Sequence, residues 1–222
     1  MIIRTKTGEL REMNSEGLLE FLGVKEAGQT VKVPAGIELI APALFALADG
    51  EGGNGVPALS EGIAWMFSTF DLDRMSERID PSGWDFRQFC NNPVIQWAHC
   101  FDIPAIGRAE NISADDKGLH GFIVFNGREY DPFGWGIGER VKAGVIRAGS
   151  VGFRPIEIEI PSQKDADRIG PGKDGTALIF RKQELLEFSV CNVPANPYAL
   201  AGQVHINNSK SCPDFWGGFI GV

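Results

Sequence analysis

The stretch Ile63-Ala64-Trp65-Met66-Phe67-Ser68-Thr69-Phe70 indicates the fold class, because its large apolar side chains recur at every second position. Successive side chains of a β-strand point to opposite faces, so this spacing is typical of a partly buried strand. We therefore predict a β-strand over residues 63–70.

Apolar strand patterns recur along the rest of the chain, at residues 119–125, 146–153, 156–160 and 185–193. Helix signals are fewer. Asp131 followed by Pro132 is typical of a helix start, and Phe133, Ile137 and Val141 would then share one apolar face. Residues 15–22 could form a second, short helix. The pattern predicts a β-rich α+β fold, a barrel or sandwich with a few helices, and not an alternating βαβ protein.

The composition excludes several classes of protein. The chain has 222 residues, of which 43% are hydrophobic and 23% charged, as expected for a protein with a packed core. Its net charge of −8 argues against binding to nucleic acid or to an anionic membrane surface. The longest apolar-leaning stretch, residues 36–48, is too short to span a bilayer. The four cysteines are too sparse for a disulfide framework, and no zinc-ligand spacing occurs, so we expect no metal and no cofactor.

A glycine-rich joint at residues 50–55 divides the chain. We expect an N-terminal leader over residues 1–60, a main domain over 61–200 and a C-terminal tail over 201–222. Residues 161–175 are polar and rich in Gly, Asp and Lys, which predicts a long surface loop.

Ser150 is the first candidate site residue, because it lies between Gly149 and Gly152 in an otherwise apolar strand. Missing side chains at the two glycines would let another backbone, such as a substrate strand, approach closely. The alternative is a strand end or bulge with a serine that takes no part in function.

His99 and Glu187 are the other two candidates. His99 ends the apolar run 92–99 and is a residue type that titrates near neutral pH, although it could equally be a hydrogen-bonded histidine of the core or its rim. Glu187 lies among apolar neighbours, where a carboxylate is costly to desolvate unless it is paired. Its alternative is a solvent-facing glutamate on an edge strand.

Taken together and in order, five stretches resemble the tailed-phage (caudovirus) prohead maturation serine proteases, whose fold is similar to that of the herpesvirus protease assemblin. The stretches are Phe67-Ser68-Thr69-Phe70-Asp71-Leu72-Asp73-Arg74 with Ile79-Asp80-Pro81-Ser82-Gly83-Trp84, Asn92-Pro93-Val94-Ile95-Gln96-Trp97-Ala98-His99 with Ile103-Pro104-Ala105-Ile106-Gly107-Arg108, Gly118-Leu119, Gly149-Ser150-Val151-Gly152-Phe153, and Leu186-Glu187-Phe188-Ser189-Val190 with Val193-Pro194-Ala195-Asn196-Pro197. The resemblance covers about residues 63–200 and implies an assemblin-like β-barrel core with a few surrounding helices.

The resemblance also implies roles for single residues. Ser150 would be the nucleophile, His99 the general base and Glu187 the third member of a catalytic triad. In assemblin, to which this family is similar, the third member is a second histidine. A carboxylate at this position can take over the role of that histidine, which is to orient the imidazole of the base. Ala195 and Asn196 would supply backbone N–H groups to the oxyanion.

The family further implies a biological setting. Such proteases act in the host cytoplasm inside the immature capsid, the prohead, where they cut scaffold protein, the major capsid protein and often themselves. Self-cleavage would fall within residues 1–60 or after about residue 200. The family also suggests a homodimer, without nucleic-acid, membrane or cofactor partners.

Three alternatives stay open. The chain could be a catalytically inactive capsid-assembly or scaffold-associated β protein of the same fold. It could be a cysteine hydrolase that uses Cys100 or Cys191. It could also be a β-barrel binding module that uses the aromatic tail residues Phe215, Trp216 and Phe219.

Overall fold

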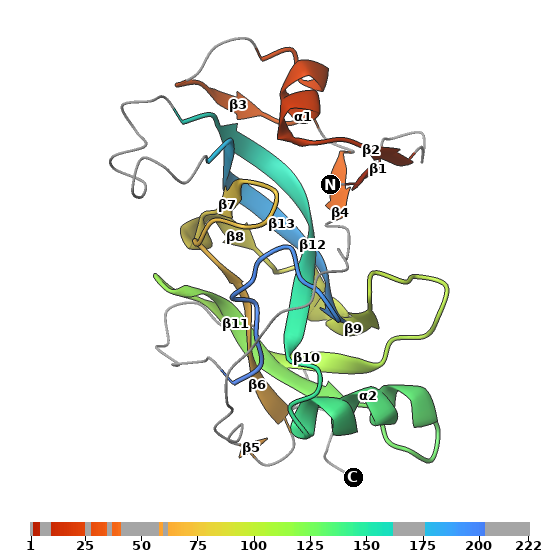
Figure 1. Cartoon of the computed structure of the whole chain (residues 1–222). Coiled ribbons are helices and arrows are strands. Elements are labelled where there is room, and N and C mark those ends of the chain that lie inside the picture. The colour runs from red at the N-terminus through yellow and green to blue at the C-terminus, as the bar shows by residue number, and fades with distance from the viewer. Residues whose placement is uncertain are drawn as a thin grey trace.

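The structure is a computed structural model of the chain, shown in Figure 1, and it describes residues 2–4, 10–24, 28–34, 37–40, 58–59, 62–161 and 176–202. The predicted joint at 50–55, nearly all of the predicted loop at 161–175 and the tail aromatics lie outside these ranges.

Strands dominate the described part of the chain. The strands are β1 (Ile2–Arg4), β2 (Leu10–Glu12), β3 (Thr30–Lys32), β4 (Glu38–Ile40), β5 (Ala58–Leu59), β6 (Gly62–Thr69), β7 (Glu77–Ile79), β8 (Trp84–Asp85), β9 (Val94–Trp97), β10 (Gly107–Ala114), β11 (Gly118–Phe125), β12 (Ala148–Glu159) and β13 (Leu178–Cys191). The helices are α1 (Ser15–Phe21) and α2 (Pro132–Lys142), with short 3₁₀ helices at Pro81–Gly83 and Phe89–Asn91. The predicted β-rich α+β class is therefore confirmed. None of the described helices has the length and hydropathy needed to cross a membrane.

The described strands form one mixed sheet in the order β2-β1-β4-β12-β13-β9-β10-β11-β6-β5, with β3 beside β12 and with β7 and β8 beside β13. This path of paired strands is open, so the predicted β-barrel is not closed by the described strands. Leu200 and Ala201 do link β12 to β6, but only through isolated bridges. Backbone hydrogen bonds accompany these bridges, since the Met66 N–H donates to the Leu200 carbonyl at 3.0 Å and the Ala201 N–H donates to the Arg147 carbonyl at 2.8 Å.

β13 lies in the middle of the sheet. It pairs antiparallel with β12 and parallel with β9. In this register Ser150 lies opposite Ser189 and Gly152 lies opposite Glu187, while Gln96 of β9 lies beside Ser189. The strands predicted at 146–153 and 156–160 are parts of the single long strand β12.

Part of the hydrophobic core lies between strand β6 and the central strand β13. All eight residues of β6 are buried, so this strand is covered on both faces and not on one. The Phe67 ring stacks on Phe188 with centroids 4.2 Å apart, and Trp65 meets the same ring edge-on at 5.9 Å. Burying each such side chain contributes about 1.5–3 kcal/mol, and aromatic geometry adds to this.

Helix α2 begins as predicted. The Asp131 side chain caps it by accepting the Gly134 N–H at 2.9 Å, and Ile137 and Val141 are buried. The prediction that Phe133 shares the buried face is wrong, because its side chain is 50% exposed and its ring instead packs edge-on against Trp97.

The described parts of residues 1–60 pack on the main sheet. Strands β3 and β4 pair with β12, and Leu18, Val33 and Ile37 belong to the hydrophobic core. Figure 1 shows these elements gathered at one end of β12, while α2 lies near its other end.

Candidate active site

The backbone at His99 is held against β13 by two hydrogen bonds. The chain leaves β9 through Ala98 and His99, which both adopt positive φ angles, 51° and 56°. The Ala98 N–H donates to the Val190 carbonyl at 2.9 Å, and the His99 N–H donates to Ser189 Oγ at 2.9 Å. A left-handed conformation is costly for residues with a Cβ, so the surrounding contacts must impose it.

The His99 side chain contacts Glu187 directly. Nδ1 of His99 lies 2.5 Å from Oε1 of Glu187, and both side chains are 5% exposed. The second carboxylate oxygen, Oε2, accepts the Ser189 hydroxyl at 2.8 Å. An ionised carboxylate can only accept hydrogen bonds, so it fixes the imidazole tautomer with the proton on Nδ1.

The other ring nitrogen of His99 is free to act as a base. Nε2 is buried and, within the part of the chain that the structure describes, has no hydrogen-bond partner. A buried nitrogen without a partner is rare and needs an explanation, for which a catalytic role is one candidate.

Ser150 lies on the adjacent strand β12, is 3% exposed, and is paired directly opposite Ser189. Directly opposed residues of antiparallel strands share a face of the sheet, so Ser150 is on the face that carries Ser189 and Glu187. Among the described residues no hydrogen bond joins Ser150 to His99. The structure therefore brings His99 and Glu187 into contact and places Ser150 on the neighbouring strand.

Glu187 is not a surface residue, because it is 4% exposed and β13 is a central strand. Its interpretation as a solvent-facing glutamate on an edge strand is therefore wrong. The sheet register also shifts between Gly152 and Phe153, as expected for the bulge considered for the Ser150 region.

The space beside Gly149 and Gly152 is filled by the protein itself. A Cβ at Gly149 would lie 2.1 Å from Phe188 Cζ, and a Cβ at Gly152 would lie 2.3 Å from Glu187 Oε1. The prediction that these glycines admit a substrate backbone is therefore wrong. They make room for an aromatic ring and for the carboxylate that holds His99.

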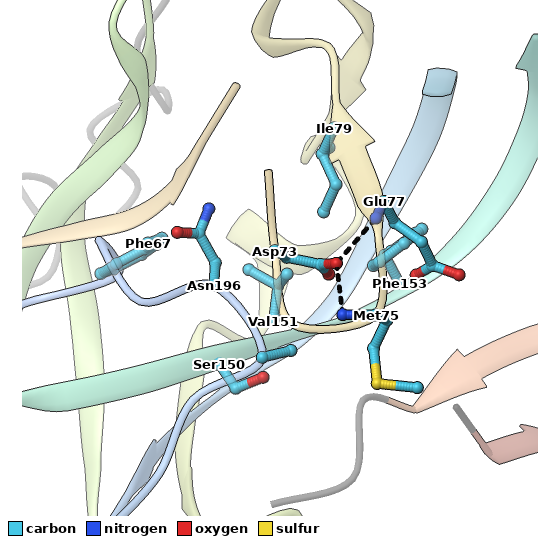
Figure 2. Close-up of a pocket in the computed structure, with 10 residues that line it drawn as sticks. Phe67, Asp73, Met75, Glu77, Ile79, Ser150, Val151, Phe153 and Asn196 are labelled. Carbon is cyan, nitrogen blue, oxygen red and sulfur yellow. Dashed lines mark hydrogen bonds between the residues drawn. The ribbon is translucent and has the colours of Figure 1, made fainter. Parts of the chain in front are cut away.

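Ala195 and Asn196 line the same pocket as Ser150, and Figure 2 shows Asn196 and Ser150 there. Arg74 fixes their turn, because its N–H donates to the Ala195 carbonyl at 3.0 Å and its guanidinium donates to the Pro194 carbonyl at 2.6 Å. Within the described part of the chain, the backbone N–H groups of Ala195 and Asn196 donate to no acceptor.

An acidic residue, Asp73, also lines this pocket. Asp73 Oδ1 accepts the backbone N–H groups of Met75 and Glu77, each at 2.8 Å, as Figure 2 shows. Burial raises the pKa of Asp73 to about 6, although these two hydrogen bonds act in the opposite direction. The remaining walls are mainly apolar and include Phe67, Met75, Ile79, Val151 and Phe153.

Sequence reasoning assigned no role to Asp73 or to Ser189. For Ser189 a signal was present, since residues two apart on a strand share a face and Ser189 follows Glu187 by two positions. For Asp73 the signal was weak, because a short acidic turn is usually a surface feature.

A second serine–histidine–aspartate cluster lies on β10 and β11. Ser113 Oγ is 3.2 Å from His120 Nδ1, and His120 Nε2 is 3.3 Å from Asp115 Oδ2 without hydrogen-bond geometry. Ser113 does not line the pocket that contains Ser150. Because Ser113 is also a buried serine beside a histidine, it supplies a matched control for Ser150.

The cysteines fit a nucleophile poorly. Cys191 is fully buried, and burial followed by the charge of Glu187 raises its pKa to about 12, so its thiol stays protonated at neutral pH. Cys100 is a free, half-buried thiol, whereas Cys90 is disulfide-bonded. Within the described residues, no group of three or more His, Cys, Asp or Glu side chains could hold a metal ion.

Comparison with known protein families identifies a match for this chain. The family described as caudovirus prohead serine protease matches residues 61–211, which is more than half of the chain and contains all five candidate residues. No curated protein and no solved structure matches the chain.

Proposed function

Because the chain belongs to the caudovirus prohead serine protease family, we propose that it is a serine endopeptidase with Ser150 as nucleophile, His99 as general base and Glu187 as the group that orients the base. The observation that carries this assignment is the state of His99. Its Nδ1 is held by Glu187 at 2.5 Å, while its Nε2 has no hydrogen-bond partner among the described residues, as a general base requires.

The mechanism follows from these contacts. Nε2 of His99 accepts the Ser150 hydroxyl proton as Oγ attacks the peptide carbonyl carbon, and the resulting imidazolium is stabilised by Glu187. The imidazolium then returns that proton to the leaving amine, and an acyl-enzyme forms. Water, deprotonated by the same nitrogen, hydrolyses the acyl-enzyme and regenerates Ser150. Nucleophile–base contacts are often long without substrate, so Ser150 need not bond His99 in the free protein.

The N–H groups of Ala195 and Asn196 would bind the oxyanion. They have no acceptor in the described structure, they line the pocket that contains Ser150, and Arg74 fixes the carbonyls of their turn. One such donor typically lowers the barrier by about 3–4 kcal/mol.

The wider assignments are also proposals. We expect an assemblin-like core, a leader at residues 1–60, a catalytic domain at 61–200 and a tail at 201–222; the family match beginning at residue 61 supports the first boundary. The substrates would be the scaffold and major capsid proteins, and the protease itself, cut inside the prohead during capsid maturation. A homodimer is expected by the same resemblance.

Covalent labelling tests the assignment without knowledge of the cleavage sequence. A fluorophosphonate should label wild-type protein at Ser150, as located by peptide mapping, and should fail to label Ser150→Ala. His99→Ala should abolish labelling while Ser150 remains present. Ser113→Ala is the matched control, since Ser113 is also buried and contacts a histidine, and it should be labelled normally.

The opposite result would favour the alternative. If folded wild-type protein gives no Ser150 adduct, or if His99→Ala is labelled as fast as wild type, the triad assignment fails. A catalytically inactive capsid-assembly or scaffold-associated β protein of the same fold would then be the better description.

A further inference from the structure

Ser189 links the two other polar groups of the site at the end of β9 and on β13. Its Oγ accepts the His99 backbone N–H at 2.9 Å and donates to Glu187 Oε2 at 2.8 Å. It is 0% exposed, so neither bond competes with water. One hydroxyl therefore fixes both the backbone that carries the imidazole and the carboxylate that holds its ring.

Without this hydroxyl, two groups would lose a partner. The His99 N–H belongs to a residue with φ of 56°, a conformation that persists only when the surroundings impose it. Within the described residues, Oε2 of Glu187 accepts no other hydrogen bond, and a buried carboxylate oxygen that loses its hydrogen bond is destabilised. The Glu187 carboxylate would then be held by His99 alone and could rotate about its side-chain torsions.

Gly152, on the neighbouring strand β12, leaves the space that the same carboxylate fills. It lies opposite Glu187 in the sheet register, and a Cβ there would lie 2.3 Å from Oε1 and 2.9 Å from Cγ of Glu187. The Glu187 carboxylate therefore packs between the Ser189 hydroxyl, which donates a hydrogen bond to it, and the backbone of Gly152.

We propose that Ser189 is a positioning residue of the protease, which together with the space at Gly152 holds Glu187 and His99 in the geometry needed to activate Ser150. This inference rests on the proposed function. Ser189 does not touch the substrate or the reacting atoms, and it acts through Glu187 and the His99 turn.

The test is the second-order rate constant for fluorophosphonate labelling of Ser150. Ser189→Ala should lower it by about 10- to 100-fold, as expected for loss of a buried hydrogen bond to a charged group. Ser189→Cys, which keeps the size but donates weakly, should fall between wild type and Ser189→Ala and guards against a folding failure. Gly152→Ala should lower the rate as well, because its methyl group displaces the carboxylate. Ser113→Ala should leave the rate unchanged.

A double-mutant cycle separates positioning from general structural support. Ser189 acts partly through Glu187, so adding Ser189→Ala to Glu187→Gln should lower the labelling rate by a clearly smaller factor than the loss of about 10- to 100-fold expected in the wild-type background, the remainder coming from the His99 N–H. An equal fold-loss in both backgrounds would overturn the proposal, as would wild-type labelling of Ser189→Ala.

An NMR measurement tests the positioning role of Ser189 independently of Ser150 labelling. The Nδ1 proton of His99 should give a strongly downfield NMR resonance because of its short contact with Glu187. Ser189→Ala should shift or broaden this resonance, whereas Ser113→Ala should not. If wild-type protein is never labelled but the resonance responds as described, the protease assignment fails and the positioning role stands. If the resonance is the same in wild type and Ser189→Ala, the positioning role fails.

Discussion

The Glu187 carboxylate is a charged group held in the middle of the sheet, where an unpaired charge would be very costly. Its two oxygens are satisfied by His99 Nδ1 and by the Ser189 hydroxyl. Removing one partner of a buried pair usually costs more than the pair contributes in total, because the other group is left unpaired. At the scale of single residues, activity and local stability should therefore both depend on this contact.

Glu187→Gln should lower the Ser150 labelling rate by about 10³- to 10⁴-fold, because an amide can favour the wrong imidazole tautomer and cannot stabilise the imidazolium. The matched control is Glu184→Gln on the same strand, which pairs with Arg154 away from the site. The control should keep a near-normal rate. If the two variants lose labelling rate to a similar extent, the effect is not specific to Glu187, and its assignment as the orienting group is contradicted.

Asp73 makes a pH-dependent contribution to stability. Its pKa rises from 3.8 to about 6 through burial, so the folded state binds the Asp73 proton more tightly than the unfolded state does. This favours folding at low pH, and the contribution is lost as the pH rises from about 4 to about 6. Above that range the ionised, buried carboxylate destabilises the fold.

Asp73→Asn should therefore increase the free energy of unfolding at pH 7 by about 1–3 kcal/mol, because an amide oxygen can still accept the two backbone N–H groups. The gain should shrink towards about pH 4. Urea denaturation at both pH values measures it, with the exposed Asp71→Asn as control. Equal stability of Asp73→Asn and wild type at pH 7 would contradict the expectation.

At the scale of elements, two glycines should respond in opposite ways. Gly149→Ala in β12 places a methyl group 2.1 Å from the Phe188 ring, so overpacking should lower the unfolding free energy by about 1–3 kcal/mol. Gly136→Ala in α2 meets only the end of the Arg140 side chain, at 3.2 Å. It should raise stability by about 0.5–1 kcal/mol, because alanine is the better helix former. Thermal unfolding of both variants checks the signs.

Most elements were predictable where local pattern decides them. The apolar alternation of β6 and β11 and the Asp131–Pro132 start of α2 depend on neighbouring residues alone. β10 was not predicted, because Gly107–Ala114 mixes charged and apolar residues and is stabilised by its neighbours β9 and β11. Whether the sheet closes depends on contacts between residues far apart, which no local pattern encodes.

The members of the candidate site remain a prediction, whereas the contacts between them could not be predicted from the sequence. His99, Ser150 and Glu187 came from the family resemblance, and the structure adds that Ser189 joins two of them. That link depends on β9 and β13 lying parallel, so that a strand end meets a residue 90 positions away. The same long-range packing explains why the glycines beside Ser150 accommodate protein side chains and not a substrate.

At the scale of the whole molecule, the N-terminal residues stabilise the main sheet. Leu18, Val33 and Ile37 are core residues, and each such side chain contributes about 1.5–3 kcal/mol when buried. A chain lacking residues 1–60 should therefore unfold at a lower temperature than the full chain and should aggregate more readily, since the pairing edge of β12 is uncovered. An unchanged unfolding temperature would show that the leader contributes nothing.

Self-processing can be checked on the same preparations. Intact mass spectrometry should show clipped wild-type protein and intact Ser150→Ala protein. Identical unclipped masses would count against cleavage of the leader or tail. If clipping does occur within residues 1–60, the product should share the lowered unfolding temperature of the truncated chain.

Glu187 and Ser189 belong to the strand with partners on both sides for much of its length. Amide protons in such a strand exchange with deuterium only when the molecule opens as a whole. The two residues proposed to orient the base should thus lie in the slowest-exchanging part of the protein, and heat should abolish labelling only as the entire fold is lost. Gentle warming would leave an enzyme that is either fully competent or fully denatured, with no partly disabled form between them.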